Sequence, residues 1–110
     1  MKPAIFHPAA LTAIREFPES VRKELGEAIL DLQEGSVLGM PLSRAMPSVA
    51  VGVSELRIRG RDGIYRAFYY TRSSRGILVV HAFVKKSQAT AKHELELGRK
   101  RLRELLDEKV

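Results

Sequence analysis

The feature that most constrains the fold is the stretch from Glu55 to Lys86, in which apolar and charged residues alternate. Its first part places the two kinds of side chain on opposite sides of an extended strand: Leu56 and Ile58 on one, and Glu55, Arg57 and Arg59 on the other. This pattern is typical of an antiparallel strand with one solvated face. Turn sequences at Gly60–Gly63 and Ser73–Gly76 divide the stretch into three segments. We therefore expect a three-strand antiparallel meander.

The two later strands are expected to be central in the sheet. The second, Ile64–Tyr70, carries mostly apolar residues on both faces, with Arg66 as a charge among them. The third, Ile77–Val84, is almost continuously apolar and is interrupted only by His81. A charge within a mostly apolar strand needs a partner, so Arg66 is a candidate functional residue.

The flanking segments complete an α+β fold. Ala4–Phe6 favours a short strand, and Pro8 and Pro18 favour the starts of two helices that form a hairpin. Residues 36–48 favour a loop, and Thr90 favours the N-cap of a final helix. We expect the order β-α-α-β-β-β-α, with an antiparallel sheet packed by the N-terminal helical hairpin and the C-terminal helix.

Length and composition narrow the class of protein. A chain of 110 residues favours a single domain, residues 1–110. The net charge of +6 favours an acidic partner such as nucleic acid. No apolar run approaches the roughly 18–20 residues that cross a bilayer, so we expect no membrane association and a cytoplasmic location.

The sequence does not favour metal or cofactor chemistry. The chain has no cysteine, which excludes disulfides and thiolate metal sites. Its three histidines, His7, His81 and His93, lie far apart in the sequence and lack the spacing of metal ligands. We expect no metal and no cofactor.

The charge of the meander suits RNA, and its residue types suit RNA cleavage by the substrate's own 2′-hydroxyl. Such a site must remove the 2′ proton, stabilise charge at phosphorus and supply a proton to the leaving oxygen. Arginine matches phosphate oxygens, lysine can transfer protons, and tyrosine can stack on a base. Each candidate also has a structural reading. The arginines can solvate the sheet or pair with Glu55 or Asp62, His81 can be a core residue, and His93 can simply be exposed.

Several segments, in this order, resemble a known family. They are Glu55-Leu56-Arg57, Tyr65-Arg66, the run His81–Lys86, and Thr90 with Glu94. Together they are similar to the phage-related HigB-like toxins of the RelE/ParE superfamily. The resemblance covers nearly the whole chain, and the His-Ala-Phe-x-Lys-Lys run is its most specific part.

The resemblance implies a RelE-like α+β fold, similar to that of the microbial ribonucleases, and a toxin of a type II toxin–antitoxin system. Such a toxin cleaves mRNA, typically in the A site of a translating ribosome. Its partner is a cognate antitoxin, in this branch usually one with a helix-turn-helix DNA-binding domain. We expect catalytic roles for Arg57, Arg66, Lys85, Lys86 and His93, and RNA contacts from Arg59, Arg61, Tyr65, His81 and Lys92.

Two departures from the family pattern leave alternatives open. Lys92 and His93 stand where RelE-like members commonly place a stacking tyrosine, and Thr90-Ala91 replaces a frequent Thr-Pro helix start. One alternative is a ParE-like inhibitor of DNA gyrase, and another is a non-catalytic basic module that binds RNA or an antitoxin. An active site also requires that the cations converge on one face, which depends on strand register.

Overall fold

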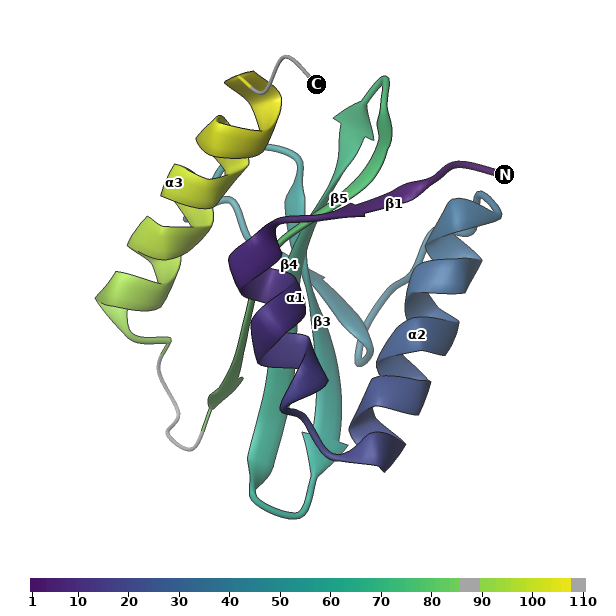
Figure 1. The fold of residues 1–110 in the computed structure, drawn as a ribbon, viewed down its shortest axis with the longest axis vertical. Helices are drawn as coiled ribbons and strands as arrows, with labels where there is room; N and C mark the ends of the chain where they lie inside the picture. The colour runs from purple at the N-terminus through teal and green to yellow at the C-terminus, as the bar shows by residue number, and fades with distance from the viewer. Residues whose placement is uncertain (86–89, 108–110) are drawn as a thin grey trace.

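The structure is a computed structural model that describes residues 1–85 and 90–107. Along the chain it contains β1 (Ala4–Phe6), α1 (Pro8–Arg15), α2 (Glu19–Gln33), β2 (Ser43–Ala45), β3 (Val53–Gly60), β4 (Gly63–Ser73), β5 (Gly76–Lys85) and α3 (Lys92–Asp107) (Figure 1). The expected α+β class is confirmed, with β2 as an additional strand. No helix in the described ranges is both long and apolar enough to span a bilayer.

The sheet is mixed rather than antiparallel, which corrects one part of the expected fold. Its strand order is β1-β5-β4-β3-β2, and β1 runs parallel to β5 while the other neighbours are antiparallel. Ala4 pairs with Ile77 and Phe6 with Val79. These two strands come from opposite ends of the chain and share no turn. Their relative direction therefore has no signature in the sequence.

The second correction concerns the expected loop over residues 36–48, which contains β2. Ser43–Ala45 pairs with β3, so that Arg44 lies directly opposite Glu55. The buried hydroxyl of Ser43 lies 2.5 Å from the hydroxyl of Tyr69, which ties β2 to the sheet. A strand of three residues is too short for a periodic pattern to show in the sequence.

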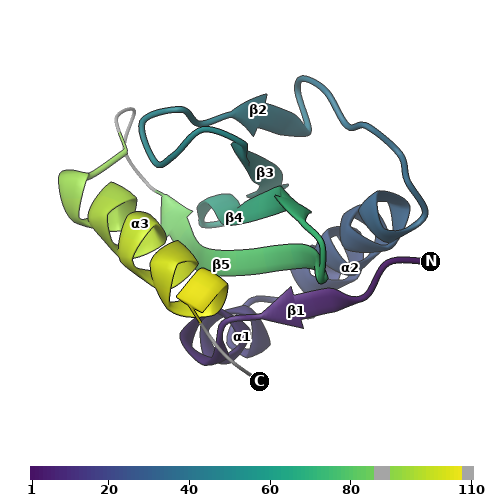
Figure 2. The ribbon, with the colours of Figure 1, turned by 90° about the horizontal axis from the view of Figure 1, so that it is seen from above.

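Helices cover the two faces of the sheet unequally. The pair α1 and α2 packs on one face, against an apolar cluster that includes Leu56 and Val79. On the other face, Leu102 and Leu105 of α3 pack against a cluster centred on Phe68. Figure 2 shows α3 lying alongside β5, while β3 and β2 extend away from it. Met46, Val49 and Val53 cover part of this second face over β3 and β4, and the face is open toward the turn between these two strands.

Close contacts at two places fix α3 on the sheet. At Gly98, a Cβ atom would lie 2.8 Å from Cδ2 of Phe68, so the absence of a side chain allows the helix to approach the strand. Near the other end of α3, Nε2 of His7 lies 2.8 Å from Oε1 of Glu104 and links α3 to the start of α1.

A buried polar network also joins α3 to β5. Nε2 of His81 lies 2.8 Å from Oε1 of Glu94, and Nη1 of Arg101 lies 2.6 Å from Nδ1 of His81. Arginine can only donate, so Nδ1 of His81 accepts and Nε2 carries the proton that it donates to Glu94. Burial and, secondarily, the charge of Arg101 lower the pKa of His81 below 6.5, against the opposing influence of Glu94.

The contact at Gly98 predicts that Gly98→Ala destabilises the fold, although alanine is the better helix former. The gain in helix propensity is about 1 kcal/mol, whereas overpacking against the buried ring of Phe68 costs about 1–3 kcal/mol. Gly26→Ala in α2 is the matched control, because its Cβ would meet nothing within 4 Å. Denaturant unfolding should show a lower free energy of unfolding for Gly98→Ala and a higher one for Gly26→Ala. A stabilised Gly98→Ala variant would contradict this packing.

The His81 network predicts a defined dependence of stability on pH. The folded pKa lies below the unfolded value of 6.5, so the unfolded chain binds the proton first as the pH falls. The contribution to stability is fully present above pH 6.5 and is lost as the pH falls from there through the folded pKa. His81→Gln removes the titration, so urea unfolding from pH 8 to pH 5 should show a flatter stability curve for the variant. Parallel curves would remove His81 as the cause.

Candidate functional site

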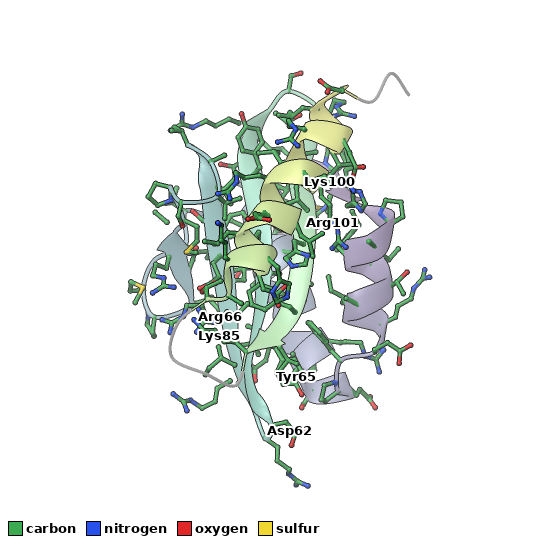
Figure 3. All side chains as sticks on the ribbon, turned by 90° about the vertical axis from the view of Figure 1, so that its left-hand side faces the viewer. Asp62, Tyr65, Arg66, Lys85, Lys100 and Arg101 are labelled. Atoms are coloured by element: carbon green, nitrogen blue, oxygen red, sulfur yellow. The ribbon has the colours of Figure 1, made fainter. Side chains whose placement is uncertain are left out.

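Strand register brings predicted cations from three strands to one face of the sheet. Arg57 of β3 lies opposite Arg66 of β4, and Arg66 lies opposite Phe83 of β5. Lys85 shares a face with Phe83, because residues two apart in a strand point the same way. Figure 3 shows Arg66 and Lys85 close together and Tyr65 apart from them. The cations therefore converge on the face that α3 leaves open.

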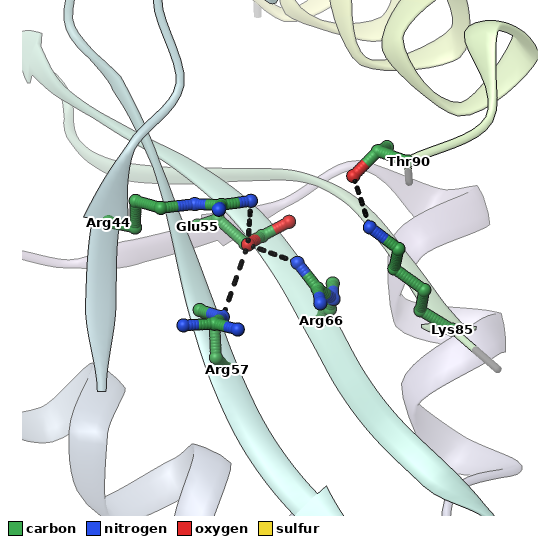
Figure 4. Close-up of polar contacts among 6 residues, drawn as sticks. All are labelled: Arg44, Glu55, Arg57, Arg66, Lys85 and Thr90. Carbon is green, nitrogen blue, oxygen red and sulfur yellow. Dashed lines mark hydrogen bonds and ion pairs between the residues drawn. The ribbon is translucent and has the colours of Figure 1, made fainter. Parts of the chain in front are cut away.

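A fully buried carboxylate lies at the centre of these cations. Oε1 of Glu55 is 2.7 Å from Nη1 of Arg66, 3.4 Å from Nη2 of Arg44 and 3.7 Å from Nε of Arg57 (Figure 4). We call the four cations Arg44, Arg57, Arg66 and Lys85, together with Glu55, the basic cluster. One carboxylate faces four cations, so the cluster keeps an excess of positive charge.

The members of the basic cluster depend on one another electrostatically. Like charges directly opposite on neighbouring strands repel, as Arg57 and Arg66 would if nothing lay between them. The carboxylate of Glu55 offsets that repulsion, and a carboxylate with no exposed surface in turn requires partners. Removal of one partner of such a buried pair costs about 3–5 kcal/mol. Glu55 thus holds the guanidinium groups in place.

Lys85 is positioned by its own contacts at the end of β5. Its Nζ donates to Oγ1 of Thr90 at 2.9 Å, and its side chain is nearly buried. Gly63, at φ +147°, allows the close approach of the Lys85 backbone, because a Cβ there would lie 2.6 Å from the Lys85 carbonyl oxygen. Thr90 was expected to cap α3, but the helix begins at Lys92 and the hydroxyl holds Lys85 instead.

Burial and mutual repulsion shift the pKa of two members of the cluster. Burial lowers the pKa of Lys85 below 10.5, and the charge of Arg66 lowers it further. Burial also lowers the pKa of Arg66 below 12.5, while Glu55 opposes that shift. The Nε atoms of Arg44, Arg57 and Arg66 and Oε2 of Glu55 are buried and have no hydrogen-bond partner among the described residues. The side chains of Arg44 and Arg57 are partly exposed, so their guanidinium groups suit a ligand that supplies anionic oxygen acceptors.

The basic cluster opens into a cavity of about 730 Å³, which we call the basic cavity. Its cationic lining consists of Arg44, Arg57, Arg59, Arg61, Arg66 and Lys85, with Asp62 at the turn between β3 and β4. Such a hollow matches the phosphate of a polyanion in charge and in hydrogen-bonding geometry. In residues 1–85 and 90–107, no three His, Asp or Glu side chains lie together as metal ligands would.

Two of the predicted RNA-contacting residues are buried away from the cavity. Tyr65 packs edge-on against Phe17 on the opposite face, with ring centroids 4.9 Å apart, so its ring is not available to a base. His81 is held between Glu94 and Arg101 beneath α3. Both side chains therefore belong to the packed interior, and their proposed RNA contacts stay predictions.

Two of the remaining predicted residues, Lys92 and His93, lie at the start of α3. Lys92 is exposed and 4.0 Å from Glu96, and His93 is exposed and 3.7 Å from Glu94; neither lines the basic cavity. Lys86 lies outside the described residues. Of the ten predicted site residues, the structure thus brings Arg57, Arg59, Arg61, Arg66 and Lys85 together.

Sequence reasoning missed Arg44 and the central role of Glu55. Arg44 lies in the segment read as a loop, where a lone arginine carries no signal. Glu55 was read as part of a solvated face, since alternation identifies the face but not its exposure. No sequence signal reveals this arrangement, because strand register alone places Arg66 opposite Arg57, two residues after Glu55.

Comparisons with known proteins identify the family and the fold of this chain. The family described as Phage derived protein Gp49-like (DUF891) matches residues 12–103. Comparison with curated protein sequences gave no match. The isolated RelE toxin of E. coli superposes with a TM-score of 0.56 at 18% identity, over 91% of this chain and 99% of that chain.

Two further RelE structures have a similar fold to this chain. A chain of the intact E. coli RelBE toxin–antitoxin complex gives a TM-score of 0.52 at 18% identity, over 79% of this chain and 100% of that chain. A free E. coli RelE mutant with two arginines changed to alanine gives a TM-score of 0.54 at 20% identity, over 90% of this chain and 95% of that chain. The family match spans most of the chain, and the structural likeness covers 79–91% of it. The chain therefore belongs to the Gp49-like family of phage-derived proteins and has the RelE-like toxin fold that its sequence predicts.

Proposed function

We propose that this protein is the toxin of a type II toxin–antitoxin system and that it cleaves mRNA on the translating ribosome. The observation that carries the proposal is the convergence of Arg44, Arg57, Arg66 and Lys85 around Glu55 at an open cavity of a RelE-like fold. A solvated sheet face would spread its charges, whereas the three arginines share one carboxylate and keep donors for a phosphate.

The proposed reaction uses a nucleophile that the RNA itself supplies. The 2′-oxygen attacks the adjacent phosphorus, a new O2′–P bond forms and the P–O5′ bond breaks. The products are a 2′,3′-cyclic phosphate and a 5′-hydroxyl end. The protein must hold the phosphate in line, stabilise the added negative charge and accept the 2′ proton. Water in the open cavity can protonate the leaving 5′-oxygen.

The three arginines have different proposed roles, which follow from how exposed their side chains are. The side chains of Arg44 and Arg57 are 42% and 25% exposed, so they can reach the phosphate oxygens directly. Arg66 is almost completely buried against Glu55. Its proposed role is to hold Glu55 in position and to add positive charge beneath the bound phosphate. Because arginine stays charged, this stabilisation is present throughout the reaction.

Lys85 is proposed as the group that accepts the 2′ proton. A lysine serves as a base only when its neutral form is populated, and burial beside Arg66 lowers the pKa of Lys85. The hydrogen bond from its Nζ to Thr90 holds the amine in place, and Lys85 lines the basic cavity. His93, which is exposed and outside the cavity lining, is not needed for this step.

The proposed partner is a cognate antitoxin with a helix-turn-helix DNA-binding domain. The E. coli relative was crystallised as the RelBE toxin–antitoxin complex, which supports a protein inhibitor for this fold. An excess of cations around an open cavity also favours a partner that presents acidic groups. The proposed site of action is the cytoplasm, where mRNA and ribosomes are found.

The first prediction tests the function directly. Purified protein is added to translating ribosomes and mRNA ends are mapped, while DNA gyrase supercoiling is assayed in parallel. We expect new mRNA ends with cyclic phosphates and unchanged supercoiling. Intact mRNA with blocked supercoiling would establish the gyrase reading instead, and no effect in either assay would leave only a binding module.

Arg57→Gln should lower the rate of cleavage by about 10²–10³-fold, the usual effect of removing one donor at a developing charge. Arg57 is partly exposed, so the fold should tolerate the change better than it would tolerate Arg66→Ala, which strands a buried carboxylate. Arg15→Gln, an exposed arginine at the end of α1, is the matched control and should cleave normally. Equal rates for the two variants would remove Arg57 from the site.

Lys85→Arg separates proton transfer from charge. Arginine keeps the cation but cannot give up its proton, so cleavage should fall by about 10²–10⁴-fold while phosphate affinity is retained. The wild-type rate should rise with pH up to the lowered pKa of Lys85, and this rise should be absent in the variant. A variant with the wild-type rate and pH profile would restrict Lys85 to an electrostatic role.

A further inference from the structure

A second hollow adjoins the basic cavity and differs from it in chemistry. It has a volume of about 350 Å³ and is lined by Pro41, Leu42, Arg57, Arg59 and Ile64. Arg57, Arg59 and Ile64 also line the basic cavity, so the two hollows lie next to each other. The other wall, Pro41 and Leu42, comes from the segment before β2. We call this hollow the apolar pocket.

The apolar pocket is built into the sheet. The backbone amide of Arg57 donates to the carbonyl oxygen of Leu42 at 2.8 Å, so the pocket's apolar wall is attached to the strand that carries its arginines. Leu42 is itself partly buried against the core under α2. Ile64 lies opposite Arg59 in the β3–β4 register and forms the apolar surface between the two hollows. These contacts hold three apolar side chains beside two guanidinium groups.

We propose that the apolar pocket holds one nucleobase of the RNA, adjacent to the phosphate bound in the basic cavity. The inference rests on the proposed function and names a base-binding subsite for it. A nucleobase is flat, uncharged and largely apolar on its faces, and it can stack on a guanidinium plane or pack on aliphatic side chains. Arg57 and Arg59 could also hold a phosphate, but the side chains of Pro41, Leu42 and Ile64 offer no donor and suit the apolar face of a base better.

The placement of the tyrosines supports this assignment. Base stacking in single-strand binding commonly uses aromatic rings. Tyr65 and Tyr69 are buried in the core on the opposite face of the sheet, so neither can serve a base at the basic cavity. The apolar pocket lies directly beside that cavity. Arg59 is exposed and has no carboxylate partner among the described residues, so its guanidinium is available to cover a base.

The test measures binding of small probes to the intact protein by titration calorimetry. The probes are adenosine and uridine 5′-monophosphates, ribose 5-phosphate and inorganic phosphate. The readout is the ratio of the dissociation constant for ribose 5-phosphate to that for the better nucleotide. This ratio isolates the base, because the phosphate contribution is common to both ligands. We expect a ratio of about five or more, since one stacked base contributes at least about 1 kcal/mol.

Variants then locate the effect in the apolar pocket. Arg59→Ala should reduce the ratio to about one. Arg61→Ala is the matched control, because it removes the same charge from the basic cavity but does not line the apolar pocket, and it should leave the ratio unchanged. Leu42→Ala should also reduce the ratio, and its thermal unfolding is measured to confirm the fold. Arg59→Ala decides the matter if Leu42→Ala does not fold.

The outcomes separate this inference from the proposed function. Equal binding of nucleotides and ribose 5-phosphate, or no nucleotide binding, overturns the base subsite even if the protein cleaves mRNA. A high ratio that depends on Arg59 upholds the subsite even if no mRNA is cleaved, in which case the proposed function fails alone. If the ratio of dissociation constants fell to about one in Arg61→Ala as well as in Arg59→Ala, the effect would come from charge, and the base subsite would be overturned.

Discussion

The ion pair between Glu55 and the surrounding arginines governs the arrangement of the whole functional face. Arg57 and Arg66 lie directly opposite each other on neighbouring strands, and a third guanidinium, from Arg44, approaches from the sheet edge. Such proximity is tolerable because the carboxylate lies among them, buried and shared. Glu55 is therefore the counter-ion that allows a dense positive surface to form on a stable sheet, and it neutralises only part of that surface.

The three-strand meander can be predicted from the sequence, but the burial of its charged side chains cannot. Alternation placed Arg57 and Arg59 on one face correctly, because side chains in a strand have a strict period of two. The same alternation gave Glu55 a solvated position, although the neighbouring strands and Arg44 enclose it completely. The convergence of Lys85 and Arg66 followed from pairing register, which depends on turn geometry and on the irregularity between Phe68 and Tyr69. The short β2 strand had no periodic signal to reveal it, whereas β1 was predicted as a strand and only its parallel pairing with β5 was not.

The unequal covering of the sheet connects the fold to the site. Helices α1 and α2 close one face with a continuous apolar core, whereas α3 covers the other face chiefly along β5. Gly98 brings α3 close to Phe68, and the His81 network fixes its first turns. The charged ends of β3 and β4 are thereby left accessible beside a well-ordered apolar cluster. The arrangement explains why cations of low exposure and an open cavity coexist in so small a protein.

The parallel pairing of β1 with β5 has a consequence for synthesis of the chain. Residues 4–6 cannot find their partners at residues 77–79 until most of the polypeptide has been made. The basic cluster likewise requires Lys85, near the end of β5, together with Arg44 from β2. Long-range pairing of this kind delays folding relative to elongation. A nascent chain on the ribosome therefore lacks the assembled cationic face until β5 has emerged.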